Sequence, residues 1–92
     1  MWELERTPQK VADSKMTVYI LFSEKAQKYY TGSTQNIDVR IFEHNAGKTT
    51  STKIGRPWKI VWTVQCRTRS EAMKLEKKIK SRGARRFLDS EI

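Results

Sequence analysis

Apolar and polar residues follow one another in patterns that predict a small mixed domain. An apolar, β-branched and aromatic run over residues 16–22 predicts a buried strand, and a second short strand is predicted over 28–33. The polar residues 23–28 between them are typical of a hairpin loop, so we expect the two strands to be antiparallel neighbours. A third strand is predicted over 58–66, where apolar and more polar positions alternate as in a sheet with one buried face; the apolar set is Trp58, Ile60, Trp62 and Val64.

Two helices are predicted between and after these strands. The first spans about residues 37–46, with Asn36 as N-cap and Gly47 as its stop. The second spans about 70–82, with Ser70 as N-cap and Gly83 as its end. Residues 84–92 are compatible with a short final helix. The order β-β-α-β-α, with this final helix added, predicts an α/β fold: a small three-stranded antiparallel sheet flanked by helices.

The chain divides into a polar extension over residues 1–15 and one domain over 16–92, because a chain of 92 residues has room for one core. Nineteen Lys and Arg against ten Asp and Glu give a net charge of +9, which favours polyanions such as DNA, RNA or an acidic membrane. The irregular segment 47–57 concentrates this charge in a hydroxyl-rich loop; its cations are Lys48, Lys53 and Arg56.

The cysteine and the N-terminal residues restrict the class of protein. With Cys66 as the one cysteine, neither an intramolecular disulfide nor a cysteine-based zinc site can form, and Cys66 is interpreted as a small strand residue. Residues 1–15 lack the apolar segment of a secretion signal, and no run reaches the length of a membrane span. We therefore expect a cytoplasmic protein with no membrane partner.

The second predicted helix carries a carboxylate in an unusual position. Ala72, Leu75 and Ile79 form an apolar stripe, and Glu76 lies within it, whereas Glu71 projects to the solvent side. A carboxylate at the edge of an apolar face costs free energy unless it is paired or binds a metal. The spacing leaves both readings open: a salt bridge with a Lys or Arg, or a metal ligand.

The first predicted helix and the strands carry further polar candidates. Arg40 and His44 form an i,i+4 pair on one helical edge, which suits phosphate chemistry, although a lone histidine is more often a surface residue. Tyr29 and Tyr30 point to opposite faces of their strand, so one belongs to the core and the other is more accessible.

The combination resembles the GIY-YIG nuclease family, closest to its compact single-domain members. The resemblance rests on Thr17-Val18-Tyr19, on Tyr30-Thr31-Gly32, on Arg40 and His44 in RIFEHNAGK and on Glu76 in RSEAMKLEKKIK, and it covers about residues 16–84. It implies an endonuclease that hydrolyses DNA phosphodiester bonds. Thr17, Val18 and Thr31 depart from the residues that give the family its name, and the asparagine that many members carry after the glutamate helix is missing.

The resemblance also implies roles for individual residues. Tyr19 and Tyr30 would face the scissile phosphate, one of them helping to activate water, while Tyr29 becomes the core neighbour. Arg40 would steady the phosphate, His44 would assist proton transfer, and Glu76 would hold one divalent ion, Mg²⁺ or Mn²⁺. Since an unperturbed tyrosine has a pKa near ~10, a tyrosine base requires that value to be lowered.

Two other classes of function fit the same residues. One is a non-catalytic DNA- or RNA-binding module with this fold and this basic surface; the other is an RNA-associated protein without a cleavage role. An inward Glu76 favours the enzyme, because a binding module does not need it. We expect DNA as partner, a monomer or weak dimer, and a targeting protein that directs this small domain to its substrate.

Overall fold

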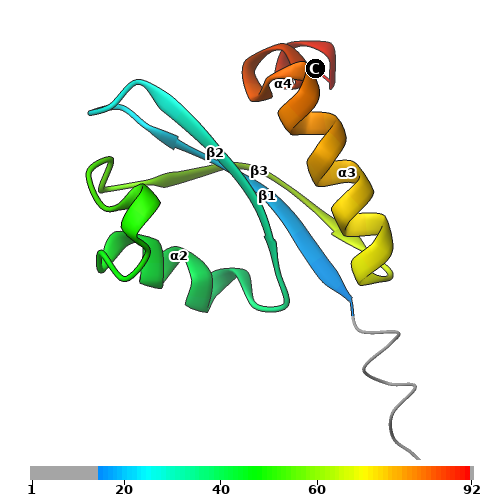
Figure 1. Cartoon of the computed structure of the whole chain (residues 1–92), viewed down its shortest axis with the longest axis horizontal. Helices are drawn as coiled ribbons and strands as arrows, with labels where there is room; N and C mark the ends of the chain where they lie inside the picture. The colour runs from blue at the N-terminus through cyan, green and yellow to red at the C-terminus, as the bar shows by residue number, and fades with distance from the viewer. Residues whose placement is uncertain (1–14, 92) are drawn as a thin grey trace, which may run out of the picture.

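Residues 15–91 are described by a computed structural model, and their helices and strands follow one another in the expected order (Figure 1). The predictions made for residues 1–14, which include most of the polar extension, lie outside these described residues. The elements are β1 (Met16–Ser23), β2 (Lys28–Thr34), α2 (Ile37–Asn45), the short 3₁₀ helix η2 (Thr50–Thr52), β3 (Lys59–Cys66), α3 (Arg69–Arg82) and α4 (Ala84–Glu91). The fold class predicted from the sequence is confirmed, including the final helix.

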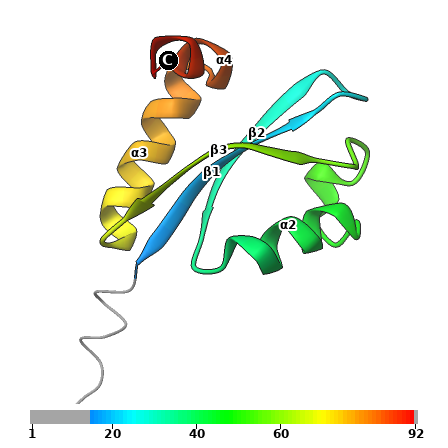
Figure 2. The same cartoon turned by 180° about the vertical axis from the view of Figure 1, so that it is seen from behind.

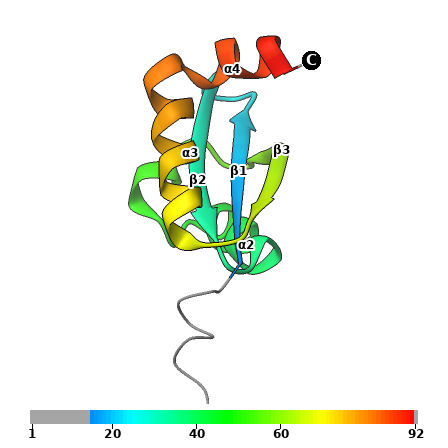
Figure 3. The same cartoon turned by 90° about the vertical axis from the view of Figure 1, so that its right-hand side faces the viewer.

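The sheet has the order β2-β1-β3, with β1 in the centre and antiparallel to both neighbours. Figures 1 and 2 show α2 and α3 on opposite sides of this twisted sheet, and in Figure 3 α3 runs alongside β2. Two apolar clusters result. Val18 and Ile20 of β1 pack against Ala72 and Ile79 of α3, whereas Tyr19 and Leu21 pack with Trp58 and the apolar face of α2. The central strand is buried on both faces because helices cover both.

The third strand departs from simple alternation. The register with β1 shifts between Ile20 and Leu21, which oppose Trp62 and Ile60 in turn, so one extra residue of β3 is accommodated there as a bulge. Residues directly opposite each other share a face. Trp62 therefore joins the α3 side, where its ring meets Phe87 of α4, while Ile60 lies on the other side. The single buried face predicted for Trp58, Ile60, Trp62 and Val64 is wrong, and Ile60 and Val64 are exposed because β3 is an edge strand.

Local hydrogen bonds set the ends of the helices. Asn36 caps α2 as predicted, because its side chain accepts from the backbone N–H of Val39 at 3.1 Å. The predicted cap of the second helix is wrong: Thr68, in extended conformation, accepts from Glu71 N–H at 3.1 Å, so α3 begins at Arg69 and Ser70 is already helical. Gly83 ends α3 at a φ of 95°, a left-handed value that favours glycine.

Candidate active site

A chain of hydrogen bonds connects β1 to the loop after α2. Tyr19 is 1% exposed, and its hydroxyl lies 3.1 Å from Nε2 of His44, which is itself 0% exposed. Nδ1 of His44 lies 2.8 Å from Oγ1 of Thr52, and this hydroxyl donates to the carbonyl of Thr49 at 3.3 Å. Since the Thr52 proton is committed to Thr49, Nδ1 carries the histidine proton and Nε2 accepts from Tyr19. His44 is therefore not a surface residue, which was one of the interpretations of the sequence, because its side chain is fully buried.

Burial determines the protonation states of the hydrogen-bonded residues Tyr19 and His44. The pKa of His44 is lowered, first because burial disfavours the charged imidazolium and second because Arg40 is nearby. The pKa of Tyr19 is raised above its ordinary 10.0, mainly by burial, while a hydrogen bond with Arg40 opposes that rise. Near neutral pH His44 is therefore a neutral acceptor and Tyr19 a protonated donor. The lowered tyrosine pKa that a tyrosine base requires is not found at Tyr19.

Arg40 lies beside Tyr19, at the solvent-accessible end of this series of hydrogen bonds. Its side chain is 31% exposed and donates to Oε1 of Glu43 at 3.0 Å, and it lies close enough to Tyr19 for each to act on the pKa of the other. The interaction with Tyr19 is the main reason why the pKa of Arg40 is raised, and the guanidinium stays charged at every relevant pH. A fixed positive charge that is partly open to solvent and joined to a proton relay can bind a phosphate beside that relay.

Tyr30 completes the aromatic part of the site. Its ring meets His44 edge-on at a centroid distance of 4.9 Å and lies 6.3 Å from the ring of Tyr19. Tyr30 is half-buried on the α2 side, whereas Tyr29 is 38% exposed on the other face and packs on Phe22. The prediction that Tyr29 is the core neighbour is wrong. Because the α2 side is covered and the edge of β2 near Tyr29 is open, the accessible tyrosine is Tyr29.

Glu76 approaches β2 from the opposite face of the sheet. One carboxylate oxygen accepts from the Ser33 hydroxyl at 2.9 Å, and the other pairs with Lys80 at 3.0 Å. The side chain is 21% exposed at an open cavity of about 230 Å³ that Lys77 and Met73 also line. Its negative charge is close enough to contribute to the raised pKa of Tyr19. Glu76 therefore has the ion-pair partner that one interpretation of the sequence requires, and the access to an open cavity that a metal ligand requires.

Gly32 and Ser33 join the two halves of the site; from the sequence, Gly32 was named only as part of a motif, without this role, and Ser33 was missed. Adjacent strand residues point to opposite faces, so Gly32 faces Tyr19 while Ser33 faces Glu76. A Cβ on Gly32 would lie 2.6 Å from the Tyr19 hydroxyl, so only glycine admits this tyrosine. A glycine inside a strand signals such a close approach of another group. Thr52 was missed as well, and no local pattern distinguishes it from the other hydroxyls of its loop.

The basic residues predicted to bind nucleic acid lie in the loop that carries Thr52. Lys48 and Lys53 are exposed, and Arg56 is half-buried because its side chain packs across the turn at Gly47. The structure therefore brings Tyr19, Tyr30, Arg40 and His44 together and places Glu76 within electrostatic reach of them. Among residues 15–91, no group of three or more His, Cys, Asp or Glu is placed to hold a metal ion, so any ion here would have few protein ligands.

Comparison with known proteins gives one consistent family. The model of the GIY-YIG catalytic domain matches residues 15–87. The UPF0213 protein SH2523 of Staphylococcus haemolyticus is 42% identical over 69 residues, which are 74% of this chain and 83% of the relative. The UPF0213 protein SERP0126 of Staphylococcus epidermidis is 42% identical over 56% of this chain and 65% of its own length.

A solved structure agrees with these relatives. The solution structure of the UPF0213 protein BH0048 from Bacillus halodurans is 33% identical, with a TM-score of 0.51 over 82% of this chain and 80% of that one. Within residues 15–91 the structure contains no helix long and apolar enough to cross a membrane. The family model spans every residue of the site described above, and this chain belongs to the GIY-YIG catalytic-domain family, a family of nucleases.

Proposed function

We propose that this protein is a metal-dependent endonuclease that hydrolyses phosphodiester bonds of DNA. The observation that carries the proposal is the buried hydrogen bond between Tyr19 and His44 with Arg40 beside it: a cation partly open to solvent stands next to a phenol that donates to a neutral base. Hydrolysis of a phosphodiester needs a fixed positive charge beside the phosphate and an acceptor for the proton of the attacking water. The series offers both within one short path.

The residues of the chain divide the work as follows. Arg40 binds a phosphate oxygen and stabilises the charge that builds up on it. As water attacks phosphorus, the Tyr19 hydroxyl takes the water proton and passes its own to Nε2 of His44, which is unprotonated and aimed at it. The new P–O bond replaces the bond to the leaving oxygen, and that oxygen takes a proton from solvent. Tyr30 packs edge-on against the His44 ring and supports it.

The residue that would hold the metal is Glu76. A single carboxylate on an open cavity suits Mg²⁺ or Mn²⁺, which retain several waters and share their remaining positions with phosphate. Such an ion, when bound, would neutralise charge on the phosphate. Ser33 holds one carboxylate oxygen in place, and Lys80 must release the other. The exposed side chain of Lys80 allows that release, because a surface ion pair of this kind is worth only about 0.3–0.5 kcal/mol.

The test is a comparison of Glu76→Gln with Glu71→Gln. Glutamine at 76 keeps an acceptor for Ser33 and loses the charge, so the free energy of unfolding should change by less than about 1 kcal/mol. Cleavage of plasmid and branched DNA with Mg²⁺ or Mn²⁺ should fall by orders of magnitude in this variant. Glu71→Gln is the matched control: Glu71 lies on the same helix and is exposed, and within residues 15–91 its side chain accepts a hydrogen bond only from the Arg67 backbone, so this variant should cut normally.

Two outcomes would contradict the proposal. If Glu76→Gln cuts at the parental rate but melts earlier, Glu76 serves only as a structural ion pair. If the unmodified protein binds DNA and RNA yet cuts neither with either metal, the chain is a binding module that keeps the family fold.

A further inference from the structure

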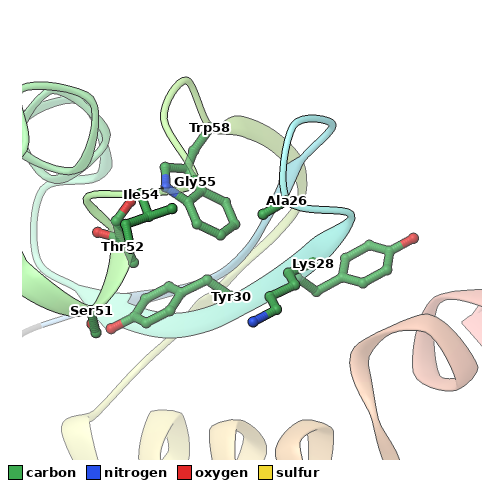
Figure 4. Close-up of a pocket in the computed structure, with 9 residues that line it drawn as sticks. Ala26, Lys28, Tyr30, Ser51, Thr52, Ile54, Gly55 and Trp58 are labelled. Carbon is green, nitrogen blue, oxygen red and sulfur yellow. Dashed lines mark hydrogen bonds between the residues drawn. The ribbon is translucent and has the colours of Figure 1, made fainter.

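A second cavity adjoins the proposed active site on the α2 side of the sheet. It has a volume of about 220 Å³ and lies between the hairpin joining β1 to β2 and the loop that follows α2 (Figure 4). Tyr30 runs along its floor and Trp58 stands behind it, while Ile54 and Ala26 border the opening. This cavity is separate from the one beside Glu76, which α3 lines.

Two of its walls belong to the proposed active site. Tyr30 contacts His44 with its ring, and Thr52 accepts the Nδ1 proton of the same histidine. The Trp58 indole nitrogen donates to the Thr52 carbonyl at 2.7 Å, which fixes the indole beside this loop. A group bound in the cavity is therefore only one side chain away from the position proposed for the scissile phosphate.

The lining selects a flat, partly polar group. The half-buried ring of Tyr30 offers a stacking surface, the buried indole of Trp58 closes the back of the cavity, and Ile54, which is 81% exposed, adds an apolar rim. Lys28 reaches in from the strand with its ammonium group, and Ser51 adds a hydroxyl at the far end (Figure 4). The volume is below the ~300–1,000 Å³ of pockets that enclose drug-sized ligands, so one ring system fits.

The surroundings indicate which ring system this is. The net charge of +9 and the exposed Lys48 and Lys53 on the same loop attract a polyanion, and the bases of a bound strand are flat groups with acceptors that Lys28 can meet. A base inside a duplex stack cannot enter a cavity, because it must first leave its neighbours and its partner. A single strand presents such a base at little cost.

We infer that the cavity between Tyr30, Trp58 and Ile54 binds an unstacked nucleobase next to the scissile phosphate, and that the preferred substrate is unpaired DNA. This inference rests on the proposed nuclease function, since it takes the Arg40 and Tyr19 site as the position of the phosphate. Base–aromatic stacking tolerates any sequence, because every base has a π-face. The cavity therefore selects for strand state rather than for sequence.

The experiment measures binding by fluorescence anisotropy without divalent metal. Short oligothymidylate is compared with an abasic strand of equal length, which keeps the phosphates and lacks bases. The unmodified protein should bind the base-bearing strand more tightly by roughly 5- to 150-fold, the range measured for stacking of one base. Equal affinity for the two strands would overturn the inference.

Variants of cavity residues test whether the preference for the base-bearing strand arises in this cavity. Ala26→Leu narrows the opening, and Lys28→Met removes the ammonium; each should reduce the preference for the base-bearing strand and leave affinity for the abasic strand and for duplex nearly unchanged. The matched controls are Ala46→Leu and Lys25→Met, the same changes at exposed positions that do not line the cavity. If Ala26→Leu and Lys28→Met weaken all three ligands alike, or leave the preference intact, the cavity does not bind a base.

Cleavage is measured separately, so that the two proposals fail in different ways. If base-dependent binding depends on the cavity but no DNA is cut with Mg²⁺ or Mn²⁺, the nuclease proposal fails and the base site stands. If DNA is cut while binding ignores the bases, the nuclease proposal stands and the base site fails.

Discussion

Removing a single oxygen from Tyr19 tests the hydrogen-bond chain at its most buried point. Tyr19→Phe keeps the ring that packs with Leu21 and Trp58, but it deletes the hydroxyl that donates to Nε2 of His44. Because His44 is 0% exposed, water cannot readily replace the missing donor. The substitution therefore leaves a buried acceptor without its partner, while the volume of the core hardly changes.

The magnitude follows from that lost partner. A buried polar group left unsatisfied costs about 1–3 kcal/mol, and part of this is offset because the phenol hydroxyl no longer has to be buried. We expect the free energy of unfolding to fall by about 1–2 kcal/mol. For a domain of about 60–100 residues each kcal/mol lowers Tm by roughly 4–8 °C, so the shift is easily measured.

Thermal melting by circular dichroism and a DNA nicking assay together form the test. Tyr29→Phe is the matched control for the melting measurement, since Tyr29 is 38% exposed and packs on Phe22 rather than on His44; it should melt like the parent. Tyr19→Phe should lose cleavage, because water can no longer pass a proton to His44. An unchanged Tm would refute the buried hydrogen bond, and an unchanged cleavage rate would refute the relay.

Three further predictions follow from the same geometry. Arg40→Ala should lower cleavage by roughly 10²- to 10³-fold with the fold retained, and Tyr30→Phe should also lose cleavage; circular dichroism and nicking assays separate folding from chemistry. Affinity for DNA should fall steeply with rising salt concentration. The double variant Lys48→Ala, Lys53→Ala should reduce this salt dependence in binding titrations, because two exposed phosphate-binding cations are lost. An affinity that does not depend on salt would contradict phosphate binding. Because burial lowers the pKa of His44, the unfolded chain binds the proton more readily, so stability should fall as pH drops through the ordinary value of 6.5; melts of His44→Gln should lack this component.

Local interactions are sufficient for much of this fold, and the sequence alone determines those parts. The caps at Asn36 and Gly83 act within a few residues, and the continuous apolar run of β1 differs clearly from the stripe of Ala72 and Ile79 in α3. These elements were predictable because backbone preferences and short-range hydrogen bonds depend on neighbouring residues. The family motifs are also read residue by residue, and Tyr19, Tyr30, Arg40, His44 and Glu76 could be selected on that basis.

Only the tertiary structure decides how those residues work. Tyr19 and His44 are separated by 25 positions, and their hydrogen bond exists because α2 packs on the central strand. That packing buries both side chains and moves their pKa values in opposite directions, which neither residue type implies. The bulge in β3 and the contact of Ser33 with Glu76, 43 positions apart, likewise depend on strand register and on the approach of α3 across the sheet. Distances between elements are fixed by packing of the whole core, and no local pattern in the chain records them.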